Sequence, residues 1–151
     1  GASGYFRGTA PNATVITMND SSYNTSSRDY IAYCFKSVAG VCKVGTYEGN
    51  NNANGTYVNL GFTPAFFMAK NIDATGSWFI IDNKRGFNSA SNEAYLQAES
   101  TATETVGNVA DLLSDGVKWR TTGGGNASNT FIYIAMADIG GNGTLPPVYS
   151  K

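Results

Sequence analysis

Residues 64–82, PAFFMAKNIDATGSWFIID, contain two apolar runs of strand length on either side of a short polar segment. Pro64 introduces the first run, 65–70, and the second, 77–82, follows the turn sequence Asp73-Ala-Thr-Gly76. Aromatic and β-branched residues favour strands, and a short loop containing glycine is typical of a hairpin. We therefore expect 65–70 and 77–82 to form a β-hairpin in which Gly76 has a positive φ.

Similar runs recur on both sides of this hairpin. We expect strands at 14–18, 56–60, 117–121 and 130–137, and a second hairpin that pairs 30–35 with 41–47 around Ala39-Gly40. Turn residues that recur about every 8 to 12 positions predict an antiparallel β-sandwich. The expected fold is an all-β, jelly-roll-like sandwich with at most one short helix. Residues 93–99 are the helical candidate, inside an otherwise irregular connection, 91–113.

Some of the expected strands are apolar at consecutive positions, notably 65–70 and 131–137. A strand of this kind belongs in the middle of a sheet that is covered on both faces. The second cover is either the partner sheet with its loops or another subunit. In 77–82 the pleat places Trp78 and Ile80 on the same face as Asp82.

The composition is that of one globular domain with a weakly charged surface. Of the 151 residues 14% are charged, against about 25% in an average soluble domain. The net charge is −1 and the ten basic residues are scattered, so nucleic acid is not an expected partner. No apolar run approaches the roughly 18 residues of a membrane span, so membrane insertion is not expected.

The triplet Tyr-Ile-Ala occurs at 30–32 and again at 133–135, and each copy follows an apolar run and a polar loop. Either the match arises by chance in a chain rich in these residues, or the fold derives from a duplicated half-unit. The second interpretation predicts three regions. Residues 1–36 would be closing strands of an upstream repeat packed on the main domain, 37–138 the β-sandwich domain, and 139–151 a C-terminal tail.

The residues that catalysis commonly needs are sparse. The chain has no histidine, which excludes Ser-His-Asp and Cys-His catalysis and the commonest zinc ligand set. Its eleven acids stand apart rather than in the paired arrangement of a glycosidase. The Asn-rich loop 50–54 has no carboxylate for calcium. We expect no enzymatic activity, no cofactor and no metal site.

The candidate binding residues lie at or near the ends of two expected strands: Trp78, Asp82, Lys84, Arg85 and Trp119. Trp78 and Trp119 are either platforms on which sugars stack or residues of the core or of a subunit interface. Asp82, Lys84 and Arg85 are either a polar patch for a glycan or partner, or a salt bridge at the strand end.

Two further sets of residues have open interpretations. Cys34 and Cys42 either form a disulfide across a turn or are separate thiols, one of them in the core. Six Asn-x-Ser/Thr sequons occur, as expected in a chain so rich in these residues: Asn12, Asn19, Asn24, Asn54, Asn126 and Asn142.

Several motifs occur in an order that resembles a known family. They begin with Tyr30-Ile-Ala-Tyr-Cys-Phe35, Lys43-Val-Gly-Thr-Tyr-Glu-Gly-Asn50 and Gly61-Phe-Thr-Pro-Ala-Phe66. They continue with Lys70, Asp73, Gly76, Trp78, Asp82, Lys84 and Arg85, and end with 111–118, 126–128 and 133–138. This order is similar to that of an uncharacterised domain that recurs in tail-fibre and other virion proteins of marine and cyanobacterial phages, often beside laminin-G-like domains.

The resemblance covers about residues 14–138 and implies a virion structural protein with a role in host attachment. The chain departs from the family pattern at Cys42 and at Gly86-Phe87, so a disulfide shared by the family is not implied and the shape of that loop stays open. The expected partners are other virion subunits in a homo-oligomer such as a trimer, and a host-surface glycan. The expected location is the virion, after synthesis in the cytoplasm of the bacterial host. The alternatives are a carbohydrate-binding module and a capsid decoration protein.

Overall fold

The computed structural model describes residues 12, 14–18, 24–85 and 94–139. The chain divides into two compact units, Gly1–Cys34 and Phe35–Lys151, which are described separately. The described residues contain nine strands and no helix, so the all-β prediction is confirmed. All nine strands lie in the second unit. Accordingly, these residues include no helix that is long and apolar enough to cross a membrane.

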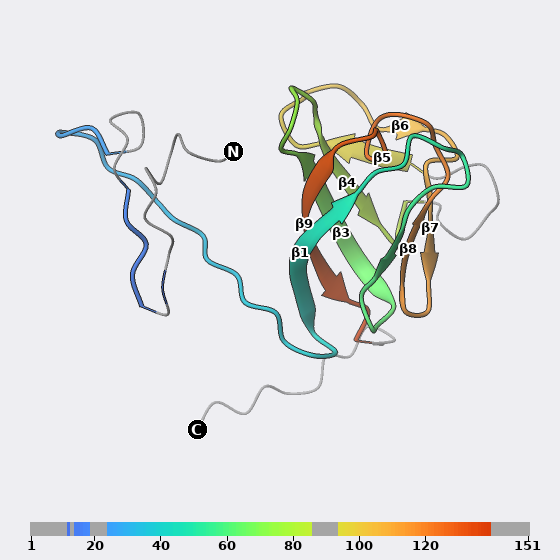
Figure 1. Ribbon diagram of the computed structural model, residues 1–151, viewed down its shortest axis with the longest axis horizontal. Coiled ribbons are helices and arrows are strands. Elements are labelled where there is room, and N and C mark those ends of the chain that lie inside the picture. Colours follow the sequence, from blue (N-terminus) through green and yellow to red (C-terminus); the bar gives the residue numbers. More distant parts are fainter. Residues whose placement is uncertain (1–11, 13, 19–23, 86–93, 140–151) are drawn as a thin grey trace. The chain divides into compact units, whose positions relative to one another are not determined.

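Two antiparallel sheets form the second unit (Figure 1). The larger has the strand order β1 (Cys42–Glu48), β9 (Thr130–Ala137), β3 (Pro64–Asn71), β4 (Trp78–Asp82), β5 (Ala94–Gln97) and β6 (Thr105–Val106). The smaller has the order β2 (Tyr57–Asn59), β8 (Gly116–Trp119) and β7 (Ala110–Leu113). The two sheets pack on each other as a β-sandwich, which confirms the predicted architecture.

The predicted hairpin at 64–82 is present as β3 and β4, with Phe67 opposite Ile81. The prediction for its loop was wrong, because Gly76 is not among the glycines with a positive φ. The side chain of Asn71 shapes the loop instead: its Oδ1 accepts hydrogen bonds from the backbone N–H groups of Asp73 (2.9 Å) and Ala74 (3.0 Å). Such an Asx turn reverses the chain without a left-handed residue.

The partner predicted for the strand at 41–47 was wrong. β1 pairs along its whole length with β9, from Cys42 opposite Met136 to Glu48 opposite Thr130. Only the start of the predicted hairpin exists, as a bridge between Val38 and Cys42. Residues 14–18 and 30–35, also predicted as strands, are not strands in the structure. A strand requires a hydrogen-bonded neighbour, and the described residues of the first unit provide none.

The segment 91–113, predicted as an irregular connection with one helical candidate, contains three short strands. β5 occupies the helical candidate and pairs with β4, with Leu96 opposite Ile80. β6 extends the same sheet, whereas β7 crosses to the other sheet and pairs with β8. Strands of two to four residues carry too few side chains for a clear alternating pattern, which is why sequence reasoning missed them.

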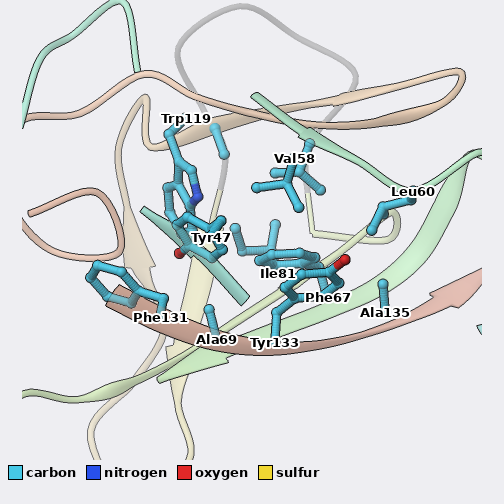
Figure 2. Packing of buried hydrophobic residues seen from close by; sticks show 12 residues of the cluster. Tyr47, Val58, Leu60, Phe67, Ala69, Ile81, Trp119, Phe131, Tyr133 and Ala135 are labelled. Carbon is cyan, nitrogen blue, oxygen red and sulfur yellow. The ribbon is translucent and has the colours of Figure 1, made fainter. Parts of the chain in front are cut away.

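The core lies between the sheets and is mainly aromatic. Figure 2 shows Trp119 and Val58 of the smaller sheet facing Phe67, Phe131 and Tyr133 of the larger one. The rings stack closely, with centroids 5.1 Å apart for Tyr47 and Phe131 and 5.4 Å apart for Phe67 and Tyr133. Aromatic pairs of this kind contribute about 0.5–1.5 kcal/mol beyond the burial of their area.

A single buried side chain, Asn126, joins the loops around this core. Its carboxamide oxygen accepts the backbone N–H groups of Asn50 and Thr56, each at 3.2 Å. Its amide nitrogen donates to Asn50 Oδ1 (2.9 Å) and to the carbonyls of Asn52 (2.9 Å) and Thr121 (2.8 Å). Asn126 is fully buried, so its side chain is shielded from water, and its bonds add to the backbone hydrogen bonds that join the two loops.

The glycine-rich stretch before Asn126 allows the loop to turn. Gly123 and Gly124 have positive φ values of 71° and 53°, which favour glycine. Position 125 requires glycine for a different reason, because a Cβ there would collide with the indole ring of Trp119. The hydroxyl of Tyr47 donates to the Gly125 carbonyl at 2.6 Å, and burial raises the pKa of this phenol. The loop therefore closes over the core aromatics.

Replacing Asn126 by alanine should lower the free energy of unfolding by about 2–4 kcal/mol, because it removes the hydrogen bonds of a fully buried side chain and takes this acceptor from the N–H groups of Asn50 and Thr56. Asn54→Ala is the matched control, because Asn54 lies in the same pair of loops but is exposed. Its cost should stay within about 0.5 kcal/mol. Urea denaturation measures both, and equal losses would contradict the structural role given to Asn126.

Asp73 connects the β3–β4 loop to the start of β9. Its Oδ2 accepts the backbone N–H of Thr130 at 2.7 Å. This bond, followed by a contribution from the Thr130 hydroxyl, holds the pKa of Asp73 below its ordinary value of 3.8. Because the folded-state pKa is the lower one, the ionised carboxylate stabilises the fold above pH 3.8, and the contribution is lost as the pH falls through the folded value.

Asp73→Asn keeps an oxygen acceptor but removes the charge. We expect a lower urea midpoint at neutral pH, and a midpoint that depends less steeply on pH below the ordinary value of 3.8. Equilibrium unfolding followed by tryptophan fluorescence at a series of pH values measures both effects. A variant with the same acid dependence as the parent chain would contradict this account.

Candidate functional site

A row of apolar side chains crosses the face of the six-stranded sheet that points away from the core. The strand register places Val44 of β1 beside Ile134 of β9, and Ile134 beside Met68 of β3. Met68 in turn lies beside Ile80 of β4, and Ile80 beside Leu96 of β5. Five neighbouring strands thus contribute one apolar residue each to this central row.

A flanking row lies on each side of the central one. The first contains Met136 and Phe66 and ends at Asp82. The second contains Ile132, Lys70 and Trp78. The apolar members of the three rows are called the outer face from here on: Val44, Phe66, Met68, Trp78, Ile80, Leu96, Ile132, Ile134 and Met136.

The outer face is separate from the core. None of its nine residues belongs to the buried core cluster or to the partly buried residues that pack against it. Ile134, at the centre, is only 8% exposed, whereas Ile132 and Met136 on either side along β9 are 40% and 43% exposed. Ile134 is therefore buried, while Ile132 and Met136 in the flanking rows remain exposed to solvent.

A continuous apolar surface of this kind is often a functional site on a soluble protein. Polar residues normally occupy the solvent side of an antiparallel sheet. The predicted sharing of one face by Trp78, Ile80 and Asp82 is confirmed. The extension of the row to Val44 and Leu96 was not predicted, because it depends on the strand order, which the sequence pattern does not reveal.

The polar candidates meet at the Asp82 corner of the outer face. Arg85 Nε lies 2.6 Å from Asp82 Oδ2, and Arg85 Nη1 lies 3.0 Å from Glu104 Oε2. The hydrogen bond to Asp82, and after it the one to Glu104, raises the pKa of the Arg85 guanidinium above its ordinary value. Lys84 is exposed, and its backbone N–H donates to Asp82 Oδ1 at 2.9 Å. The predicted salt bridge at the strand end is thus present, and it holds Arg85 at the edge of the face.

Trp78 stands at the opposite corner and is half-buried. Its backbone N–H donates to Glu99 Oε2 at 3.1 Å. A hydrogen bond from Ser77, followed by smaller contributions that include the Trp78 N–H and the charge of Lys70, lowers the pKa of Glu99. The corner therefore presents part of an indole ring beside an anion and a cation, which is chemistry that suits either a sugar or a protein partner.

Trp119, the other tryptophan among the candidate binding residues, lies elsewhere. It is fully buried in the core, where its ring contacts those of Tyr47 and Phe79. The core alternative for Trp119 is therefore the one observed, and its ring has no free face for a sugar. The structure brings together Trp78, Asp82 and Arg85 on or beside one face and separates Trp119 from them.

The remaining chemical candidates do not form a site. Cys34 and Cys42 are free thiols, and neither is fully buried, so neither the disulfide nor the core thiol is present. Cys42 Sγ donates to the Lys36 carbonyl at 3.0 Å and lines a small open pocket with Leu60 and Phe62. In the parts of the chain that the structure describes, no three His, Cys, Asp or Glu residues cluster around a potential metal position.

The sequons differ in their access to solvent. Asn12, Asn24 and Asn54 are exposed, whereas Asn126 is buried and fully engaged in hydrogen bonds. A modifying enzyme therefore cannot reach the Asn126 side chain in the folded chain. Asn19, Asn142 and the Gly86-Phe87 loop lie outside the described residues.

Two packed antiparallel sheets define an all-β sandwich domain, and its larger sheet has an apolar outer face. The chain belongs to the family described as a domain of unknown function (DUF7483), whose model matches residues 1–139. No curated protein and no solved structure matches the chain.

Proposed function

We propose that this chain is a non-enzymatic structural or adhesion module of a bacteriophage particle, in a tail fibre or a similar appendage. The observation that carries the proposal is the outer face, an apolar surface on the rigid strands of the larger sheet. A module with this surface works by contact, either with other virion subunits or with the host. The order of motifs from Tyr30 to Asp138, which resembles that of phage virion domains, supports the location on an appendage.

The polar groups at the outer face favour a role in contact over catalysis. The carboxylates of Asp82 and Glu104 both form salt bridges with Arg85. Asp111, on the smaller sheet, is paired with Arg120 Nη2 at 2.5 Å. A glycosidase needs two carboxyl groups that face each other across a cleft, whereas each of these carboxylates faces an arginine side chain. These arrangements support the proposal that the module is not an enzyme.

The location of the chain on the particle tests this proposal. We expect immunogold labelling of particles of the phage that encodes the chain to place it on a tail fibre or similar appendage. Mass spectrometry of the purified particles should find it at the copy number of an appendage protein. Labelling spread over the capsid would favour a decoration protein, and absence from the particle would contradict both assignments.

A carbohydrate-binding module is the second candidate function, and Trp78 is the observation that favours it. The indole lies at an open corner of the outer face, beside the charged side chains of Lys70 and Glu99. Sugars commonly stack on such exposed rings while polar neighbours bind their hydroxyl groups. In the phage setting this activity would recognise a host-surface glycan.

A glycan array probed with the full chain distinguishes the two candidates. The carbohydrate alternative predicts specific binding that Trp78→Ala abolishes and Tyr57→Ala preserves. Tyr57 is a suitable control because it is an aromatic residue, 40% exposed, on the smaller sheet. The assembly proposal predicts no binding that depends on Trp78.

A further inference from the structure

We propose that the outer face packs against the outer face of a second copy of this chain, related by a two-fold axis along the central row. This inference rests on the proposed function and names the partner of the same surface. The second copy is favoured over other partners by the shape of the face, the placement of its charges and its area.

The rows make the outer face self-complementary. A two-fold rotation about the central row places that row over itself, so that Met68 faces Met68 of the second copy. The same rotation exchanges the flanking rows, which brings Met136 opposite Ile132 of the second copy. Phe66 then meets the stem of Lys70, and Trp78, at the corner, meets Asp82 of the second copy, while the apolar positions of the central row meet one another. Two sheets packed in this way lie about 10 Å apart, the ordinary spacing in β-sandwiches.

The two charged side chains within the rows fit this arrangement. Asp82 ends one flanking row and Lys70 lies in the other, on the adjacent strand. Exchange of the rows brings Asp82 of each copy beside Lys70 of the other. Asp82 already accepts hydrogen bonds from Arg85 and Lys84, and Lys70 donates to the Asn71 carbonyl at 3.1 Å. Neither charge is therefore left without a polar partner when the face is covered.

The area of the face is enough for a weak, specific pair. With strands about 4.8 Å apart and alternate residues about 6.8 Å apart, the three rows cover roughly 400 Å². Side chains that project from the sheets add to this flat area, so two such faces bury roughly 1,000 Å² in total. This total is the lower limit for a specific interface. We therefore expect association that depends on concentration when the chain is isolated, and a stable pair when neighbouring subunits hold the copies together.

Sedimentation equilibrium of the full chain tests the association. We expect a reversible change from 15.9 kDa to twice that mass over about a hundredfold range of concentration. Ile132→Lys should weaken the pair about tenfold or more, because it places a charge in the contact. Leu113→Lys is the matched control: Leu113 is 37% exposed, close to the 40% of Ile132, but it lies on β7 of the smaller sheet.

Cross-linking tests the symmetry in a chain whose two native cysteines are replaced by serine. In this background Met68→Cys has one thiol on the proposed axis, so a short bismaleimide should join two copies at high yield. Ile132→Cys is off the axis, and its two copies are separated by about 13 Å along the strands, so cross-linking should be poor. Circular dichroism spectra that match the parent chain confirm that both variants fold.

Several results would overturn the inference. They are a monomer at every concentration, a trimeric mass, equal weakening by Ile132→Lys and Leu113→Lys, and equal cross-linking at the two cysteine positions. A monomeric chain found on the appendage would reject the pairing and leave the proposed function standing. A two-fold pair formed by a chain that is absent from the particle would reject the function and leave the pairing standing.

Discussion

The strands in the middle of the larger sheet are apolar on both faces, and the rest of the structure depends on this constraint. On the inner face, Phe67, Phe131 and Tyr133 are buried by the smaller sheet. On the outer face, Met68 and its neighbours lie on the solvent side of the sheet, where exposure of apolar area costs about 25 cal/mol per Å². The fold thus buries the inner apolar surface, and we propose that a second copy covers the outer one.

Polar contacts at the loops hold the strands around the inner face in place. Asn126 joins the loop after β1 to the loop before β9 through four hydrogen bonds. Asp73 connects the β3–β4 loop to the first residue of β9. Both contacts meet near the start of β9, the strand that lies between β1 and β3. The outer face is consequently presented by strands whose ends are fixed, which favours a preorganised contact surface.

The parts of the fold that sequence reasoning predicted are those set by local pattern. The β3–β4 hairpin, the extent of β9 and the shared face of Trp78 and Asp82 all follow from alternation and turn residues. The pairing of β1 with β9 joins residues far apart in the chain, and no local signal specifies it. The sequence marks Asn126 as a sequon and as part of a family motif, but not as a buried residue, since a buried asparagine is indistinguishable from an exposed one in such an Asn-rich chain. The central row was missed for the same reason as the β1–β9 pairing.

The central claim is that this module acts through the outer face, and a cryo-EM map of the assembled appendage tests it most directly. The account predicts that β1, β9, β3 and β4 present this face to the same face of a second copy, about 10 Å away across a two-fold axis. A map in which Met68, Ile132 and Met136 face open solvent would contradict the account.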